Sequence, residues 1–367
     1  MRTHKITLPP EVPLRSVSAF ARLFQFETWL REMVYLETKA HLGASWWSGA
    51  EQAFNRSGAP GIPAEKSLTR DKKHPHMSTP ENDPLWFLSF DSLLKIIFDE
   101  ALWPLFSTYL TTKELLQARF TEIAPIRNRI GHNRTLHGDD MDRLRQMLRD
   151  LDQGFWRFCT SFNDRFPFVG ERRTDPVYQH FRDRMAFDYA EVEPNKWALV
   201  GSSLGMSQTV SVEYSYRPSA IVTEGFPEKG RLYHFNFSQT ASSNRHLDYL
   251  RIIDASSNSH PMLVYIILDS FQQKLEVTVP ALYPTEEIIK TAEHFFTLCG
   301  NYFTYSFREQ IEKQNPLPDT DPEIFEQYDA VNRAFADFAA RWPHYVIPPG
   351  NPFAFLGPDC PCSFFEA

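Results

Sequence analysis

The chain has 367 residues, of which 42% are hydrophobic and 14% are aromatic, and it contains 31 Phe. This length is enough for two domains, and the composition supports packed cores rich in Phe and gives no sign of long disorder. The formal net charge of −8 excludes a protein generally coated with basic residues, so a polyanion would have to bind to a local patch.

Spaced apolar residues predict an amphipathic helix from Arg15 to about Leu42. A short helix is expected around Trp47–Asn55, and residues 56–83, which are polar and rich in Pro and Gly, are expected to form a long loop. His74 and His76 in this loop form an H-x-H pair, but no further ligands cluster nearby, which favours a flexible or RNA-contacting loop over a metal site. The apolar stripe of the first helix includes Phe20, Leu23, Phe24, Leu30, Met33 and Val34.

Residues 85–110 are again apolar and helical in character, with Pro104 expected to kink or split the helix. Thr111-Thr112 is expected to cap the N-terminus of a helix that runs to about Thr121. Pro125 is expected to interrupt this helix and to start a new one from Ile126 to about Arg134.

A last helix of this region is predicted from about Asp139 to Phe162, and residues 1–165 are therefore expected to form an all-α bundle. Residues 166–367 are predicted to form a mixed α+β domain, so the fold class of the whole chain is α+β. Its expected helices are Val177–Phe187, Thr285–Ile311 and Pro322–Arg341, and its expected strands are Trp197–Val200, Thr209–Tyr216, Arg231–Phe237, Met262–Leu268 and Leu275–Val279.

The second domain contains a possible serine-hydrolase motif, G-x-S-x-G, at residues 201–205. In hydrolases the serine lies on a turn between a strand and a helix, whereas the residues that follow here, up to Tyr216, alternate as in a strand. We therefore interpret the segment as a hairpin turn. The role of the domain stays open between a sensor or recognition module and a cover that restrains the first domain.

Four cysteines are too few and too scattered for a disulfide framework. Cys360 and Cys362 supply only two of the four ligands of a tetrahedral zinc site, and we interpret them as reduced thiols. The N-terminus lacks the apolar core of a signal peptide, and no window approaches about 18 uninterrupted apolar residues. We expect a cytoplasmic protein with no membrane segment, no metal and no cofactor.

The segment from Glu122 to Arg134, EIAPIRNRIGHNR, combines the residue types needed to cleave a phosphodiester. The guanidinium of Arg127 carries a permanent charge and a fixed fork of donors that suits the phosphate oxygens in the transition state. The imidazole of His132 transfers protons near neutral pH. Together they supply electrostatic and acid–base catalysis of RNA cleavage without a metal ion.

The spacing of the segment places Asn128 and His132 on one helix face, and Arg127 about 140° from His132. A second copy of the helix, related by a two-fold axis, would help these side chains to converge, and Gly131 would let a neighbouring backbone approach. Residue types and spacing alone also fit an ordinary solvated helix face. Seven arginines form a local run that we interpret as a phosphate-binding patch, at positions Arg119, Arg127, Arg129, Arg134, Arg143, Arg145 and Arg149.

Residues 127–132, Arg-Asn-Arg-Ile-Gly-His, resemble the RNxxxH signature of HEPN domains. The amphipathic helix around Phe26–Val34 is similar to the first helix of that family, and the apolar piece Leu85–Phe98 resembles the helix before the signature. The link at residues 135–140 into a last helix also fits. The resemblance covers roughly residues 15–162.

The resemblance implies a helical bundle that forms a homodimer and brings two signature segments into a shared cleft. It implies a metal-independent endoribonuclease whose products carry a 2′,3′-cyclic phosphate and a 5′-hydroxyl. Carried over to this chain, Arg127 stabilises the phosphate, His132 transfers protons and Asn128 orients the site. The resemblance also implies a toxin or antiphage-defence (abortive infection) role, with a partner protein or phage component as a possible trigger.

Arg129, Arg134 and His137 are candidate RNA-binding residues. For Arg134 and His137, a solvated end of the segment is an equally good explanation.

Glu27, Arg31 and Glu32 are weaker site candidates, because Glu27 and Arg31 lie four residues apart and are expected to form an exposed ion pair.

Two alternatives to a ribonuclease remain open from the sequence. One is a HEPN protein that binds RNA or a nucleotide, or acts as a regulator, without cleaving. The other is an unrelated helical interaction scaffold.

Overall fold

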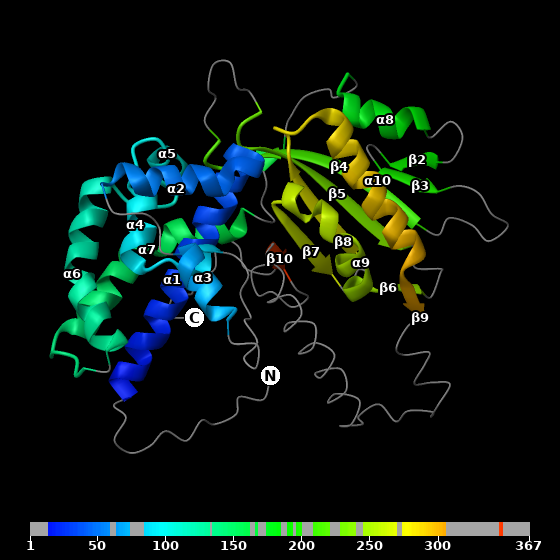
Figure 1. The fold of residues 1–367 in the computed structure, drawn as a ribbon. Helices are drawn as coiled ribbons and strands as arrows, with labels where there is room; N and C mark the ends of the chain where they lie inside the picture. The colour runs from blue at the N-terminus through cyan, green and yellow to red at the C-terminus, as the bar shows by residue number, and fades with distance from the viewer. Residues whose placement is uncertain are drawn as a thin grey trace, which may run out of the picture.

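The computed structural model describes residues 14–58, 64–73, 84–132, 134–161, 166–167, 174–184, 189–193, 196–199, 208–220, 228–239, 245–269, 274–305 and 345–347. A group of helices comes first along the chain and a mostly antiparallel sheet with its own helices follows (Figure 1). The fold class is therefore α+β, as the sequence predicted. Within the described ranges, no helix is both long and apolar enough to cross a membrane.

The helical part agrees with the sequence in its main members. The predicted first, second and last helices are present, but a further helix, α3, lies inside the segment that was expected to be a loop. His74 and His76 lie outside the described residues. The helices are α1 (Leu14–Leu42), α2 (Trp46–Arg56), α3 (Ala64–Asp71), α4 (Phe90–Ile97), α5 (Trp103–Phe106), α6 (Lys113–Gly131) and α7 (Asp140–Thr160), with 3-10 turns at Gly43–Ser45 and Pro84–Phe87.

Proline shapes two of these helices in different ways. Pro104 lies in the first turn of the short α5, where a missing N–H costs nothing, so the apolar run at 85–110 is split as predicted. Pro125 lies inside α6, and the predicted interruption there is wrong. Pro125 has no N–H to donate to the carbonyl of Thr121, four residues earlier. Both residues are exposed, so water can hydrogen-bond to that carbonyl instead. The RNxxxH segment therefore belongs to the last two turns of a continuous helix.

The first core is built around α1. Phe26 contacts the rings of Phe90, Phe120 and Phe155, which come from α4, α6 and α7. The apolar side chains of α7 are buried in this core: Leu144, Met147, Leu148, Leu151 and Phe155. The predicted stripe of α1 is partly wrong, because Phe20 and Phe24 are 56% and 62% exposed. The buried face of this helix follows Ala19, Leu23, Phe26 and Leu30 instead.

The second part is a sheet with strand order β10-β7-β8-β5-β4-β3-β2, in which β1 also pairs with β4. All of its pairs are antiparallel except β10 with β7. The strands are β1 (Phe166–Pro167), β2 (Tyr189–Glu193), β3 (Lys196–Leu199), β4 (Gln208–Tyr216), β5 (Arg231–Gln239), β7 (Tyr265–Asp269), β8 (Lys274–Pro280) and β10 (Tyr345–Ile347). A separate pair joins β6 (Arg245–Leu247) to β9 (Phe303–Tyr305).

All five strands predicted here are present, although β7 starts later than expected because Ser257–Met262 forms a 3-10 turn. Strands β3 and β4 pair antiparallel, as a hairpin requires, but the turn predicted at residues 201–205 lies outside the described residues. The predicted helix at 285–311 ends earlier, at Asn301. The helix predicted at 322–341, Cys360 and Cys362 also fall outside the described residues.

The two faces of the sheet pack against different partners. Tyr233, Phe235 and Phe237 of β5 belong to a core shared with α8 (Pro176–Arg184), α9 (Tyr249–Ala255) and α10 (Thr285–Asn301). Leu232 of β5 and Tyr265 of β7 belong instead to the core of the helical part. The boundary predicted at residue 165 stays a prediction, since side chains from both sides of it share this first core.

A buried polar network connects α1 to the sheet. Glu37 of α1, which is fully buried, accepts hydrogen bonds from Nε and Nη2 of Arg217 at 3.0 and 2.6 Å. Tyr109 donates to the same carboxylate at 2.9 Å, and Ser219 donates to its other oxygen. Arg217 also donates to the carbonyl of Ser161 at 3.4 Å. Burial alone would lower the pKa of Arg217, but Glu37 and Tyr109 raise it above its ordinary value, so Arg217 stays charged.

Replacing Arg217 by Ala should lower the free energy of unfolding by about 3–5 kcal/mol, because Glu37 would be left as a buried, uncompensated charge. Urea denaturation measures this loss. Arg145→Ala is the control, because its pair with Asp142 is exposed and should contribute less than about 1 kcal/mol. A loss for Arg217→Ala as small as that of the control would contradict the role given to this network.

His260 makes stability depend on pH. Burial lowers the pKa of His260 to about 4 from 6.5. Between pH 6.5 and 4 the unfolded chain therefore binds a proton that the folded chain does not, so this contribution to stability is lost as the pH falls. In urea titrations across that window, His260→Gln should lose less stability on acidification than the wild type. If the free energy of unfolding falls with pH equally in the two proteins, His260 is not the source of this pH dependence.

Candidate functional site

Arg127, the first residue of the RNxxxH segment, points from α6 to α1. Its Nε donates to Oε1 of Glu27 at 3.1 Å, and Nη2 of Arg31 lies 3.2 Å from the other oxygen of the same carboxylate. The Glu27 and Arg31 side chains are only 13% and 11% exposed, whereas that of Arg127 is 36% exposed. Glu27 therefore holds one edge of the Arg127 guanidinium and leaves part of the side chain accessible.

The predicted ion pair of Glu27 with Arg31 is present, but the expectation that it would be exposed is wrong. Arg31 also donates to the carbonyl of Leu88 at 3.1 Å and lies over the ring of Trp86 at 5.7 Å, because the segment before α4 crosses this face of α1. The Glu27 carboxylate therefore lies between two guanidinium groups. Glu27 and Arg31 are largely shielded from water, whereas the Arg127 side chain stays partly accessible.

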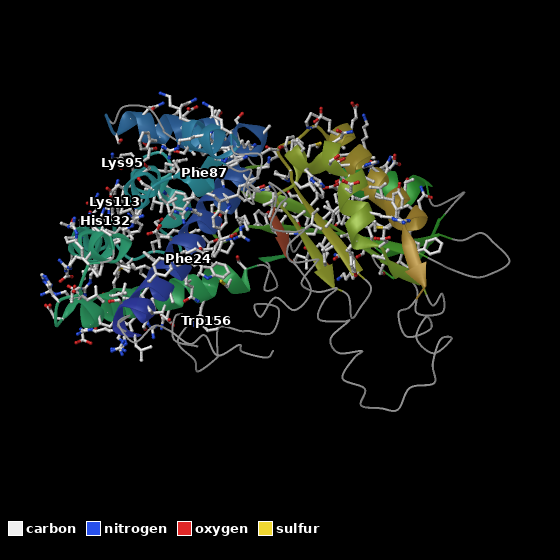
Figure 2. All side chains as sticks on the ribbon, turned by 60° about the horizontal axis from the view of Figure 1, so that its bottom comes forward. Phe24, Phe87, Lys95, Lys113, His132 and Trp156 are labelled. Atoms are coloured by element: carbon white, nitrogen blue, oxygen red, sulfur yellow. The ribbon has the colours of Figure 1, made fainter. Side chains whose placement is uncertain are left out.

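His132 and Asn128 are both exposed near the C-terminal end of α6. His132 is the C-cap residue, and its backbone N–H donates to the carbonyl of Asn128 at 3.2 Å. Within the described part of the chain, no hydrogen bond or ion pair joins the side chains of Arg127 and His132. Arg127, Asn128 and His132 therefore lie at the end of one helix, and Figure 2 labels His132 on the helical part of the molecule.

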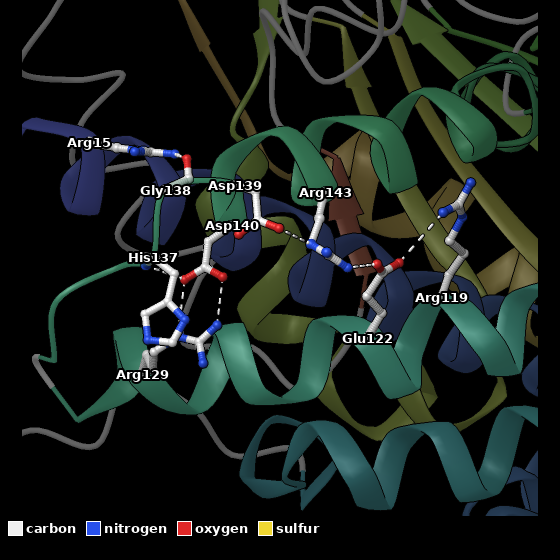
Figure 3. Close-up of polar contacts among 9 residues, drawn as sticks. All are labelled: Arg15, Arg119, Glu122, Arg129, His137, Gly138, Asp139, Asp140 and Arg143. Carbon is white, nitrogen blue, oxygen red and sulfur yellow. Dashed lines mark hydrogen bonds and ion pairs between the residues drawn. The ribbon is translucent and has the colours of Figure 1, made fainter.

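Arg129, a predicted RNA-binding residue, has a partner within the protein. Its Nε and Nη2 donate to the two oxygens of Asp140 at 3.0 and 2.5 Å, and the Asp140 side chain is 3% exposed. The backbone N–H of His137 donates to Asp140 at 2.7 Å (Figure 3). Asp140 thus ties the end of α6 to the start of α7 and holds the connection between them. RNA binding by Arg129 stays a prediction. In the structure, Arg129 holds the connection between α6 and α7 through Asp140.

The run of arginines is not a free basic patch. Arg119 pairs with Asp150. Glu122 lies between Arg119 and Arg143, and Arg143 also pairs with Asp139 (Figure 3). Arg145 lies 3.6 Å from Asp142. These pairs cancel most of the positive charge that the sequence indicated on α6 and α7.

Arg134 and His137, the other predicted RNA contacts, are both exposed. The side chains that remain for an anion at this end of the bundle are therefore Arg127, Arg134, His132 and His137.

Gly131 does not have the role expected for it within one chain. A Cβ built on it would meet no atom of the described residues within 4 Å, so no neighbouring segment makes the close approach that a glycine permits.

Glu27 has a larger role in the structure than the sequence indicated. Its spacing to Arg31 was visible, but its contact with Arg127, 100 residues later, depends on how α1 packs against α6.

Metal-binding side chains do not gather in the part of the chain that the structure describes, where no group of three His, Cys, Asp or Glu is placed to hold an ion. Cys159 and Cys299 are buried, and burial raises the pKa of both thiols. These two cysteines are therefore poor nucleophiles at neutral pH.

Comparison of the chain with models of protein families, with curated proteins and with solved structures finds no match.

Replacing Asp140 by Ala should lower the free energy of unfolding by about 1.5–3 kcal/mol, because Arg129 and the N–H of His137 lose a charged acceptor. Urea denaturation reports the loss. Asp142→Ala, two residues further along α7, is the matched control: this side chain is 77% exposed and its removal should change stability by less than about 1 kcal/mol. Equal effects of the two substitutions would show that Asp140 does not anchor the connection.

Proposed function

We propose that the chain is a metal-independent endoribonuclease of the HEPN type. The observation that carries the proposal is the position of Arg127, whose Nε is held by Glu27 while its side chain stays 36% exposed on the same helix end as His132. A guanidinium held in this way does not have to reorganise when it meets a phosphate, and preorganised charge is usually the largest electrostatic contribution to catalysis.

The proposed reaction uses the RNA's own 2′-hydroxyl. The 2′-oxygen loses its proton and attacks the adjacent phosphorus, the bond to the 5′-oxygen breaks, and that oxygen takes up a proton. Arg127 stabilises the charge on the non-bridging oxygens, and the exposed imidazole of His132 moves a proton in one of the two transfers. Asn128 orients the site. The products are a 2′,3′-cyclic phosphate and a 5′-hydroxyl.

The resemblance to HEPN domains extends the proposal to the assembly and its setting. Two copies of the α6 end, paired across a two-fold axis, would supply two histidines to one composite site and so provide both proton transfers. We propose a cytoplasmic homodimer that acts in toxin or antiphage defence, with residues 166–367 as the part that meets a trigger or partner.

Arg127→Ala and His132→Ala should each reduce the cleavage rate of total RNA by about 100-fold or more, because each removes a charge or a proton carrier from the transition state. Gel electrophoresis of the RNA measures the rate, and end-group analysis detects the cyclic phosphate. EDTA should leave the wild-type rate unchanged.

Two controls separate loss of catalysis from loss of folding. Arg251→Ala removes an exposed arginine from α9, and His294→Ala removes a histidine from α10. Both residues lie in the sheet part, and both variants should cleave at the wild-type rate. Cleavage that persists in His132→Ala would defeat the assignment. RNA binding with no cut products from the wild type would point to a HEPN protein that binds without cleaving.

A further inference from the structure

An exposed aromatic pair lies on the same face of α1 as the carboxylate that holds Arg127. Phe20 and Phe24 are 56% and 62% exposed, and their rings lie 24° from parallel with centroids 6.3 Å apart. Glu27 follows Phe24 by three residues and Phe20 by seven, which are the spacings of one helix face. Single exposed apolar residues are ordinary, but two adjacent, nearly parallel rings form a continuous apolar strip.

Two contacts place this strip beside the end of α6. Glu27 of α1 bonds to Arg127, and Arg15 at the start of α1 donates to the carbonyl of Gly138, in the connection after α6 (Figure 3). The stretch of α1 between these contacts carries Phe20 and Phe24. The stretch of chain between their partners carries His132. The two stretches therefore run alongside each other, and Figure 2 shows Phe24 and His132 on the same helical part of the molecule.

The charges around the strip favour an anionic partner with flat apolar groups. The Arg127 side chain is 36% exposed beside Glu27, and Arg134 is exposed in the neighbouring connection. An unpaired nucleotide joins a planar base to a phosphate, which matches an aromatic surface next to a guanidinium. Aromatic side chains stack on such bases with little regard to sequence, whereas the bases of a duplex are already stacked.

We propose that Phe24, supported by Phe20, is a stacking site for an unpaired base of the RNA next to the phosphate that Arg127 contacts. This inference rests on the proposed ribonuclease function. Phe24 lies about one helical turn from Glu27, so a base on its ring places the adjoining phosphate near Arg127.

A fluorescent, uncleavable oligonucleotide tests the site. The probe is a short single strand that is 2′-O-methylated throughout and contains 2-aminopurine, whose fluorescence is quenched on stacking. The wild type should bind and quench it. Phe24→Ala should lose the quench and bind about five- to a hundredfold more weakly, and Phe24→Trp should restore both. The same probe in a duplex should not be quenched by the protein.

Leu115→Ala is the matched control, because Leu115 is also an exposed apolar residue but lies in the first turn of α6, at its far end. It should bind and quench like the wild type. Unchanged affinity and quench in Phe24→Ala would overturn the stacking site. So would a change in oligomeric state by light scattering with the quench intact, which would assign the strip to a protein contact.

The two proposals fail separately. Wild-type protein that quenches the probe but leaves unmodified RNA uncut would refute the nuclease and retain the stacking site. Wild-type cleavage of unmodified RNA, together with an unchanged quench in Phe24→Ala, would refute the stacking site and retain the nuclease.

Discussion

The buried charge of Glu37 is the constraint on which the arrangement of the two parts depends. A carboxylate that is fully removed from water is stable only if its oxygens are paired, and Arg217, Ser219 and Tyr109 supply the donors. These donors come from the segment after β4 and from the segment before α6. The C-terminal half of α1 can therefore occupy one position relative to the sheet without losing a charged hydrogen bond.

Helix α1 also contributes Glu27 to the candidate site, so the fixed position of α1 affects that site. Between its two ends α1 passes through the aromatic core around Phe26, and three turns before Glu37 it presents Glu27 to Arg127. The position of the Arg127 guanidinium thus follows from a helix that is anchored by packing in its middle and by a buried ion pair near its end. The sheet part and the proposed catalytic end share one continuous helix, which gives a physical route for one to influence the other.

Charge pairing explains how an acidic chain can present a small cationic site. Carboxylates on α6 and α7 neutralise Arg119, Arg129 and Arg143, so that little unpaired positive charge remains on this surface. At the end of α6, Arg134 is exposed and the Arg127 side chain stays 36% exposed. A single phosphate fits such a site better than an extended polyanion, which suits local cleavage of a flexible strand.

The sequence by itself determined the α+β class, the main helices of the first part and the central strands, because local periodicity and turn residues carry that information. It also determined which residues share the end of α6. Only the tertiary structure decided that Pro125 stays within a helix, that Phe24 is exposed and that Glu27 meets Arg127. Those outcomes depend on which face of α1 is covered by α4, α6 and α7. Contacts between residues 100 positions apart leave no periodic trace in a single chain.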